Sequence, residues 1–171
     1  MIDILEIAEE VREEVSKQMV LKDGLTLGKV IKERGHDDTH YIDIIAEDAL
    51  AQALKRRKLS CIIVSEEYGT RTFSLDTNSD VEFTLIFDPI DGSTNAISGI
   101  PFFSSALAYS DKVSEVGMED VSQGVVTMYG GETFYGIKGE GMFINGEHFT
   151  ARPPKRRRPI ISVYSYGPKL D

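Results

Sequence analysis

Apolar residues recur at helical spacing in two segments of the N-terminal third. In residues 2–20 they fall at positions 4, 7, 8, 11, 15 and 19, and in residues 40–56 at positions 42, 45, 46, 49 and 53. This spacing gives each segment one apolar face and predicts two amphipathic helices. Gly24 and Gly28 mark a break between them, and residues 25–34 fit either a short helix or a mobile flap.

Shorter apolar runs follow and are typical of strands. They cover residues 59–64, 83–87, 102–109, 121–129, 132–137 and 142–144. Gly130-Gly131 and Asn145-Gly146 are hairpin dipeptides, so the last strands are expected to be antiparallel. Residues 70–82 read as a polar surface excursion and residues 111–120 as an acidic loop. The order predicts an α+β fold with two helices packed on a mainly antiparallel sheet.

The C-terminal end changes character. The run Lys155-Arg156-Arg157-Arg158 stands beside three prolines, which is more typical of a solvated linker than of a nucleic-acid patch. Ile160 to Tyr164 then begins a new apolar strand, and the sequence ends seven residues after Tyr164. We therefore expect one domain over residues 1–158, and over residues 159–171 the start of a second α/β domain that is otherwise missing.

Composition narrows the class of protein. The 171 residues suffice for one domain with a core, and the net charge of −9 argues against a nucleic-acid binder. The N-terminus is acidic and amphipathic, and no long apolar stretch appears, so we expect neither a signal peptide nor membrane binding. A single cysteine, Cys61, excludes an internal disulfide and suits a reducing cytoplasm. Its apolar surroundings favour a buried core thiol over a nucleophile.

The chemistry centres on the segment from Phe87 to Thr94. A buried strand is expected to end at Asp88, because Pro89 has no N–H for the sheet. Asp91 follows, Gly92 permits a tight turn, and Ser93-Thr94-Asn95 resembles a helix cap. Two carboxylates and the Ile90 carbonyl are oxygen ligands that suit Mg²⁺, and a helix start can bind phosphate. Taken alone, the motif also fits a turn with two capping acids.

Two further acidic pairs lie upstream. Asp43 and Glu47 are four residues apart on one predicted helix, so they share a face. Glu66 and Glu67 directly follow the strand over residues 59–64. By itself, the first pair fits a surface pair near a helix start, and the second fits a solvated turn. The three acidic groups together favour a metal site.

In combination these motifs resemble the inositol monophosphatase and fructose-1,6-bisphosphatase superfamily of Mg²⁺-dependent sugar phosphatases, particularly its archaeal dual-activity branch. The resemblance covers roughly residues 1–165. It rests on Asp43-x-x-x-Glu47, on Ser65-Glu66-Glu67, on the segment from Asp88 to Asn95, and on the pattern from Phe134 to Gly146. The segment from Asp88 to Asn95 is the most specific of these.

The resemblance implies a role for each matching residue. Glu66, Asp88, the Ile90 carbonyl and Asp91 match metal ligands, for about two or three Mg²⁺ ions in a complete fold. Glu66 and the Ser93 hydroxyl would orient the attacking water, and Asp43 would hold Ser93 or a metal-bound water. The phosphate group of the substrate, a sugar or inositol phosphate, would be bound by Asp91, Gly92, Ser93 and Thr94.

The sequence departs from this family in two ways. Ser93 stands where the family usually has Thr, and the family's second half, with an acidic ligand in a Trp-Asp-x-x-Ala motif, is absent from a chain without Trp. The leading hypothesis is a Mg²⁺-dependent phosphomonoesterase whose activity is impaired in this chain because the second half is missing. The alternatives are a non-catalytic metal- or phosphate-binding fragment, which works by pairing with a missing C-terminal domain or as a homodimer, and an inactive remnant.

Overall fold

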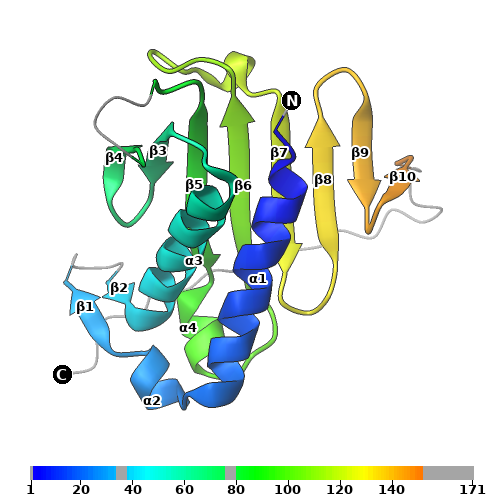
Figure 1. Cartoon of the computed structure of the whole chain (residues 1–171). Coiled ribbons are helices and arrows are strands. Elements are labelled where there is room, and N and C mark those ends of the chain that lie inside the picture. The colour runs from blue at the N-terminus through cyan, green and yellow to red at the C-terminus, as the bar shows by residue number, and fades with distance from the viewer. Residues whose placement is uncertain (1, 34–37, 76–79, 152–171) are drawn as a thin grey trace.

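The computed structural model of the chain describes residues 2–33, 38–75 and 80–151. Helices α1 (Ile4–Leu21) and α3 (Tyr41–Arg57) lie side by side over one face of an eight-stranded sheet (Figure 1). Both helices were expected from the apolar spacing, and both predictions are confirmed. The α+β class is confirmed with them.

The sheet has the strand order β10-β9-β8-β7-β6-β5-β3-β4. Neighbouring strands are antiparallel, except that β3 and β5 run parallel. The strands are β3 (Cys61–Ser65), β4 (Gly69–Phe73), β5 (Thr84–Asp91), β6 (Ser104–Ser110), β7 (Gln123–Met128), β8 (Thr133–Ile137), β9 (Gly141–Ile144) and β10 (Glu147–Phe149).

The core lies between the two helices and the sheet. Ile7 and Val11 of α1 and Ile42 and Leu50 of α3 are buried in it. From the central strands the core receives alternate residues, which are Leu85, Phe87, Leu107 and Val125. Cys61 is also buried, and burial raises the pKa of its thiol to about 12. The thiol therefore belongs to the core, as the sequence indicated.

The intervening residues of the central strands face away from the helices. Ile86 pairs in register with Ala108, and Ala108 with Gly124, and all three are only half-buried. Together with their neighbours they line a shallow hollow of about 240 Å³. The sheet thus has one helix-covered face and one face of small apolar residues.

Short elements connect the main ones. They are α2 (Gly24–Leu27), β1 (Val30–Lys32), β2 (Thr39–His40), α4 (Ser93–Ile97) and the 3₁₀ turn η1 (Met118–Asp120). The first of these settles part of residues 25–34 as a short helix, and β1 then pairs antiparallel with β2. The acidic loop contains η1.

Besides the short strands β1 and β2, two strands of the eight-stranded sheet were not expected. The polar composition of residues 70–82 predicts a surface excursion, but Gly69–Phe73 forms the edge strand β4, with Arg71 paired to Ile63. Its polar composition hides it because an edge strand presents side chains to water. Glu147–Phe149 forms β10, which continues the Asn145-Gly146 hairpin. Both turn residues have positive φ, 50° and 82°, as the dipeptide predicted.

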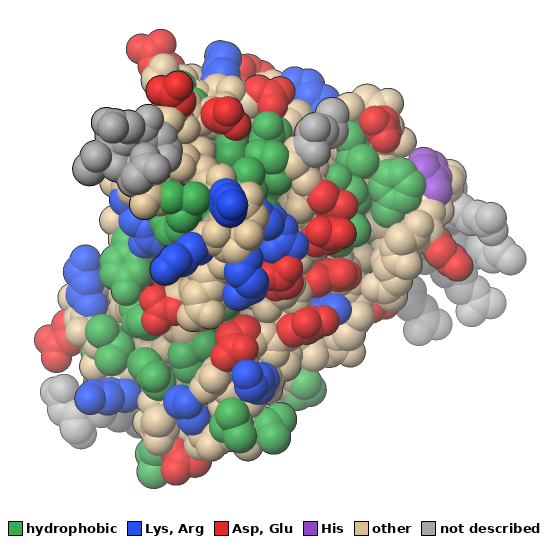
Figure 2. Space-filling view, viewed as in Figure 1, with side chains coloured by type: hydrophobic (Ala, Val, Ile, Leu, Met, Phe, Trp, Pro, Cys, Tyr) green, Lys and Arg blue, Asp and Glu red, His purple; other side chains and the backbone are tan. Residues whose placement is uncertain are grey.

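The helix-covered face carries interspersed acidic and basic side chains (Figure 2). Arg57 of α3 lies 2.6 Å from Glu10 of α1, and Arg56 contacts the same carboxylate. These ion pairs join the outer sides of the two helices. None of the helices in the described ranges is long and apolar enough to cross a membrane.

Several expectations concern residues outside the described ranges. The basic run Lys155–Arg158, the strand from Ile160 to Tyr164 and the second domain over residues 159–171 all lie there. The domain division at residue 158 stays a prediction.

Candidate metal and phosphate site

Asp43 is fixed at the first turn of α3. Its Oδ2 accepts a hydrogen bond of 2.6 Å from the backbone N–H of His40, the residue before the helix. A carboxylate in this position satisfies a free amide at the helix start and interacts favourably with the helix dipole. Asp43 is only 2% exposed. The surface-pair interpretation is therefore wrong for Asp43, because the carboxylate points into the fold.

The Ser93 hydroxyl meets Asp43 from the other side. Ser93 Oγ lies 2.7 Å from Asp43 Oδ1 and 3.0 Å from the carbonyl oxygen of Ile90. One hydroxyl hydrogen is thus shared between two acceptors. Burial raises the pKa of the Asp43 carboxyl to about 6, against the hydrogen bonds from Ser93 and His40, which lower it.

The turn that carries Ser93 differs from the prediction in two details. The strand does not end before Pro89: β5 continues to Asp91, with a register shift between Asp88 and Asp91. A bulge of this kind accommodates a proline inside a strand. The helix cap is Gly92, with φ 94°, and Ser93 is the first residue of α4.

Glu66 directly follows β3, and Asp88 lies beside the end of β3 within the parallel strand β5. The register pairs Ser65 with Phe87, and the backbone N–H of Glu66 donates to the Phe87 carbonyl at 3.1 Å. The next residues on the two strands, Glu66 and Asp88, are therefore neighbours. Asp88 also lines the hollow on the face of the sheet opposite α1 and α3. This register agrees with the prediction that Glu66 and Asp88 lie close together.

Glu47 and Glu67 are buried partners of other side chains. Glu47 is 1% exposed and lies 2.6 Å from Arg71 Nη2, while Ser65 Oγ also donates to it. Glu67 is 8% exposed and accepts a hydrogen bond from Thr39 Oγ1. The surface-pair interpretation fails for Glu47, and the solvated-turn interpretation holds only for the exposed Glu66.

The residues thus form two adjacent groups. Asp43, Ser93 and the Ile90 carbonyl are in contact, and Glu66 lies beside Asp88. Asp91 and Thr94 are exposed at the end of the same turn. Within the part of the chain that the structure describes, no group of three or more His, Cys, Asp or Glu side chains is placed to hold a metal ion. The complete ligand set stays a prediction.

The donors present are nonetheless those that Mg²⁺ prefers. In proteins this ion is usually bound by one or two carboxylates together with waters and substrate phosphate. Neighbouring carboxylates on β3 and β5 and a carbonyl on the bulge meet that requirement. Their chemistry fits Mg²⁺ better than Zn²⁺, whose sites in proteins usually include histidine nitrogen or cysteine sulfur ligands.

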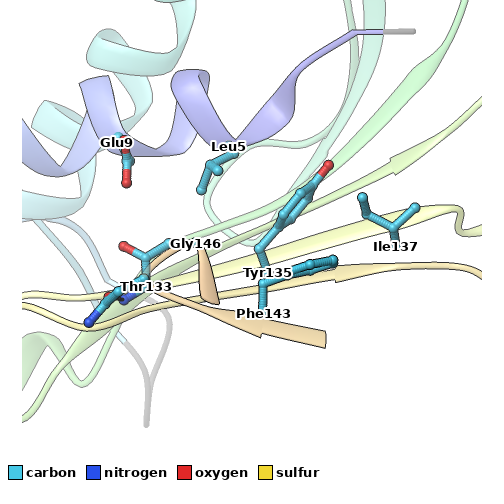
Figure 3. Close-up of a pocket in the computed structure, with 8 residues that line it drawn as sticks. Leu5, Glu9, Thr133, Tyr135, Ile137, Phe143 and Gly146 are labelled. Atoms are coloured by element: carbon cyan, nitrogen blue, oxygen red, sulfur yellow. Dashed lines mark hydrogen bonds between the residues drawn. The ribbon is translucent and has the colours of Figure 1, made fainter. Parts of the chain in front are cut away.

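A separate hollow of about 240 Å³ lies between α1 and the strands β8 and β9 (Figure 3). Leu5, Tyr135, Ile137 and Phe143 give it mainly apolar walls, and Glu9 stands at its edge. In the sheet, β6 and β7 separate it from β5, and the sequence-predicted site residues do not line it. It therefore has no part in the site described above.

Sequence reasoning missed Ser65, Arg71 and Thr39 as contacts of the buried acids. Ser65 was noted only as the residue before Glu66, and Arg71 lies on the strand that was not expected. Their contacts join positions 18, 24 and 28 residues apart, which no local pattern reveals.

Known proteins similar to this chain are phosphatases. A fructose-1,6-bisphosphatase from Pyrococcus furiosus is 37% identical over 144 residues, which cover 82% of this chain and 50% of the relative. A bifunctional NADP phosphatase/NAD kinase from Methanococcus maripaludis is 29% identical, with 90% of this chain and 28% of the relative covered. The chain thus spans about half the length, or less, of these relatives.

A solved phosphatase structure has a similar fold. A solved inositol monophosphatase-fructose 1,6 bisphosphatase matches with a TM-score of 0.65 and 27% identity, over 90% of this chain and 57% of that one. The family profile described as the inositol monophosphatase family matches residues 3–169. The chain, with its β3 and β5 acids and its Ser93 turn, therefore belongs to the inositol monophosphatase family.

Proposed function

We propose that this chain carries the metal- and phosphate-binding part of a Mg²⁺-dependent phosphomonoesterase that acts on a small sugar or cyclitol phosphate. The observation that carries the proposal is the meeting of β3, β5 and α4 at one end of the sheet, which groups Glu66 with Asp88 and Ser93 with Asp43. The family membership supports the reaction class.

In this proposal Glu66, Asp88, Asp91 and the Ile90 carbonyl hold the metal. Bound Mg²⁺ would lower the pKa of a coordinated water and offset the charge of the phosphate. The hydroxyl of Ser93, held by Asp43, would orient that water together with Glu66. The backbone N–H groups of Gly92, Ser93 and Thr94 would donate to phosphate oxygens at the start of α4.

Asp43 is proposed to act through Ser93 and not directly on the substrate. Its carboxylate accepts the Ser93 hydroxyl hydrogen, so the Ser93 oxygen keeps a fixed direction and its lone pairs stay available. Fixing a polar group before the substrate arrives avoids reorganisation during the reaction. Asp43 is therefore proposed to position Ser93.

The proposed substrate class is a phosphate monoester, and the alcohol is not specified further. The similar proteins include a fructose-1,6-bisphosphatase and an NADP phosphatase/NAD kinase. The substrates in these names are both phosphate esters, and they differ in the alcohol that carries the phosphate. Turnover by these 171 residues alone is expected to be weak, because the relatives' remaining length would supply further substrate contacts.

The test is a calorimetric Mg²⁺ titration of the chain and of Asp88→Asn, followed by phosphate-release assays. The substrates are inositol 1-phosphate, fructose 1,6-bisphosphate and NADP. We expect Mg²⁺ binding that Asp88→Asn weakens at least about tenfold, because a metal ligand is lost. Arg57→Met, remote from the site, is the matched control and is expected to bind Mg²⁺ like the unmodified chain. Absence of Mg²⁺ binding would contradict the proposal.

A second candidate function is a non-catalytic fragment that works only with a partner. It is favoured by the apolar face around Ala106, Ala108 and Gly124, which none of the described helices covers, and by the chain's spanning about half the length of its relatives. Exposed apolar patches commonly mark interaction surfaces. The partner would be a second copy or a separate C-terminal domain. Light scattering tests this candidate: a stable monomer that releases phosphate would exclude it.

A further inference from the structure

The turn between β3 and β4 carries Glu66, and buried polar contacts hold both of its sides. Glu47 of α3 lies beneath it, 1% exposed. Ser65 Oγ donates to Glu47 Oε1, and Arg71 Nη2 lies 2.6 Å from Glu47 Oε2. One buried carboxylate therefore joins the end of β3, the start of α3 and the edge strand β4.

Ser65 passes this restraint to the backbone around Glu66. Its hydroxyl hydrogen is directed at Glu47, so its lone pairs face the turn. They accept the backbone N–H groups of Glu67 at 3.1 Å and of Tyr68 at 3.4 Å. The two amides after Glu66 are thereby fixed relative to α3.

Arg71 closes the turn from the other strand. Its guanidinium carbon lies 4.7 Å from the centre of the Tyr68 ring, so one side chain contacts both Glu47 and Tyr68. The planar guanidinium suits both contacts, because it can pair with a carboxylate and lie against an aromatic face. Thr39 of β2, two residues before α3, also donates a hydrogen bond to Glu67.

We propose that Glu47, Ser65 and Arg71 form a clamp that holds the β3–β4 turn and so positions Glu66 beside Asp88 for the metal. Glu47 and Arg71 are positioning residues in this assignment, and neither contacts the metal or the substrate. The effect of the clamp on metal binding rests on the proposed function, because Glu66 needs a fixed position only if it is a metal ligand. The clamp itself is a property of the chain without metal.

The experiment compares four variants by amide hydrogen exchange without metal. Arg71→Met and Glu47→Gln remove the ion pair, and Arg71→Lys keeps the charge but loses the planar contact with Tyr68. Arg57→Met is the matched control, since the Arg57–Glu10 pair has the same 2.6 Å separation on the far side of the helices.

We expect Arg71→Met and Glu47→Gln to exchange the Glu67 and Tyr68 amides at least about tenfold faster, because the turn opens locally. Amides of β6 and β7 should keep their protection. The exchange rates at the turn should be intermediate in Arg71→Lys and unchanged in Arg57→Met. Unchanged exchange at Glu67 and Tyr68 in both Arg71→Met and Arg71→Lys would overturn the clamp.

A Mg²⁺ titration of the same variants tests the consequence. Loss of an outer contact typically weakens metal binding by about 10–100-fold, which we expect for Arg71→Met but not for Arg57→Met, and Arg71→Lys should partly restore affinity. Faster turn exchange with unchanged Mg²⁺ affinity would overturn the positioning role. If the unmodified chain binds no Mg²⁺, the proposed function fails with the positioning role, while the exchange data still decide whether the clamp exists.

Discussion

Ser93 Oγ lies 2.7 Å from Asp43 Oδ1, a contact between residues 50 positions apart in the chain. It joins the first turn of α4 to the first turn of α3, so two helix starts meet at one hydrogen bond. The same hydroxyl lies 3.0 Å from the Ile90 carbonyl, inside the bulge of β5. The contact therefore couples the helix layer to the strand that carries Asp88 and Asp91.

Replacing Ser93 tests the strength of that coupling. Ser93→Ala leaves Asp43 with one hydrogen-bond donor fewer in a buried position, so we expect a loss of about 1–3 kcal/mol in the free energy of unfolding. Ser93→Thr keeps the hydroxyl and restricts its rotamer, so its stability should lie within about 0.5 kcal/mol of the unmodified chain. Urea denaturation measures both, with Ser98→Ala at an exposed position as the control. Equal losses in Ser93→Ala and Ser98→Ala would contradict the prediction.

Asp43 should give the chain a distinctive pH dependence. Its pKa is about 6 in the folded chain, against an ordinary aspartate value of 3.8, because of burial. Between these pH values the folded state binds a proton that the unfolded state has lost, so stability falls as pH rises. The Asp43 contribution is fully present below about pH 4 and is lost by about pH 6, a change on the order of 2–3 kcal/mol.

Asp43→Asn removes this component because the amide does not titrate in that range. The variant should lose less stability than the unmodified chain between pH 4 and pH 6, whatever its absolute stability. Urea midpoints at several pH values in this window measure the difference without metal. Parallel pH profiles for the two proteins would show that Asp43 does not carry the shift.

A chain of hydrogen bonds supports the bulge of β5. Ser105 Oγ donates to the Pro89 carbonyl at 2.5 Å, so Tyr129 Oη, at 2.9 Å, serves as donor to Ser105. Ser105→Ala removes both contacts and should cost about 1–3 kcal/mol, while Tyr129→Phe removes only the outer one and should cost about 1 kcal/mol. The double variant should cost less than the sum, because the variants share a contact. Denaturant unfolding measures all three, and strict additivity would contradict the proposed chain.

The apolar pattern of the sequence was sufficient to predict the main architecture. It was not sufficient to predict which polar side chains are buried. The faces of α1 and α3 follow from spacing alone, because a helix with a strong apolar stripe must bury it. The same spacing placed Asp43 and Glu47 on one face but gave no sign that they are buried. Their burial depends on Ser93 and Arg71, which come from distant segments.

The prediction at Pro89 failed for a related reason. Proline usually ends an internal strand because it cannot donate to the ladder, and here the bulge removes that requirement. The bulge is supported by Ser105 of β6 and by Tyr129, which directly follows β7. The local motif around Asp88 therefore identified the family, while the backbone geometry required the rest of the sheet.

Gly92 should tolerate no side chain, and Gly99 offers a matched comparison. Gly92 has φ 94°, and an added Cβ would lie 3.2 Å from the Phe103 Cβ, whereas Gly99 has φ 72° with nothing within 4 Å of an added Cβ. Gly99→Ala should therefore cost only the backbone strain, about 1 kcal/mol, and Gly92→Ala about 2–3 kcal/mol, because packing against Phe103 is disturbed as well. Urea denaturation measures this difference. Equal costs at the two glycines would show that Phe103 yields to the added methyl group.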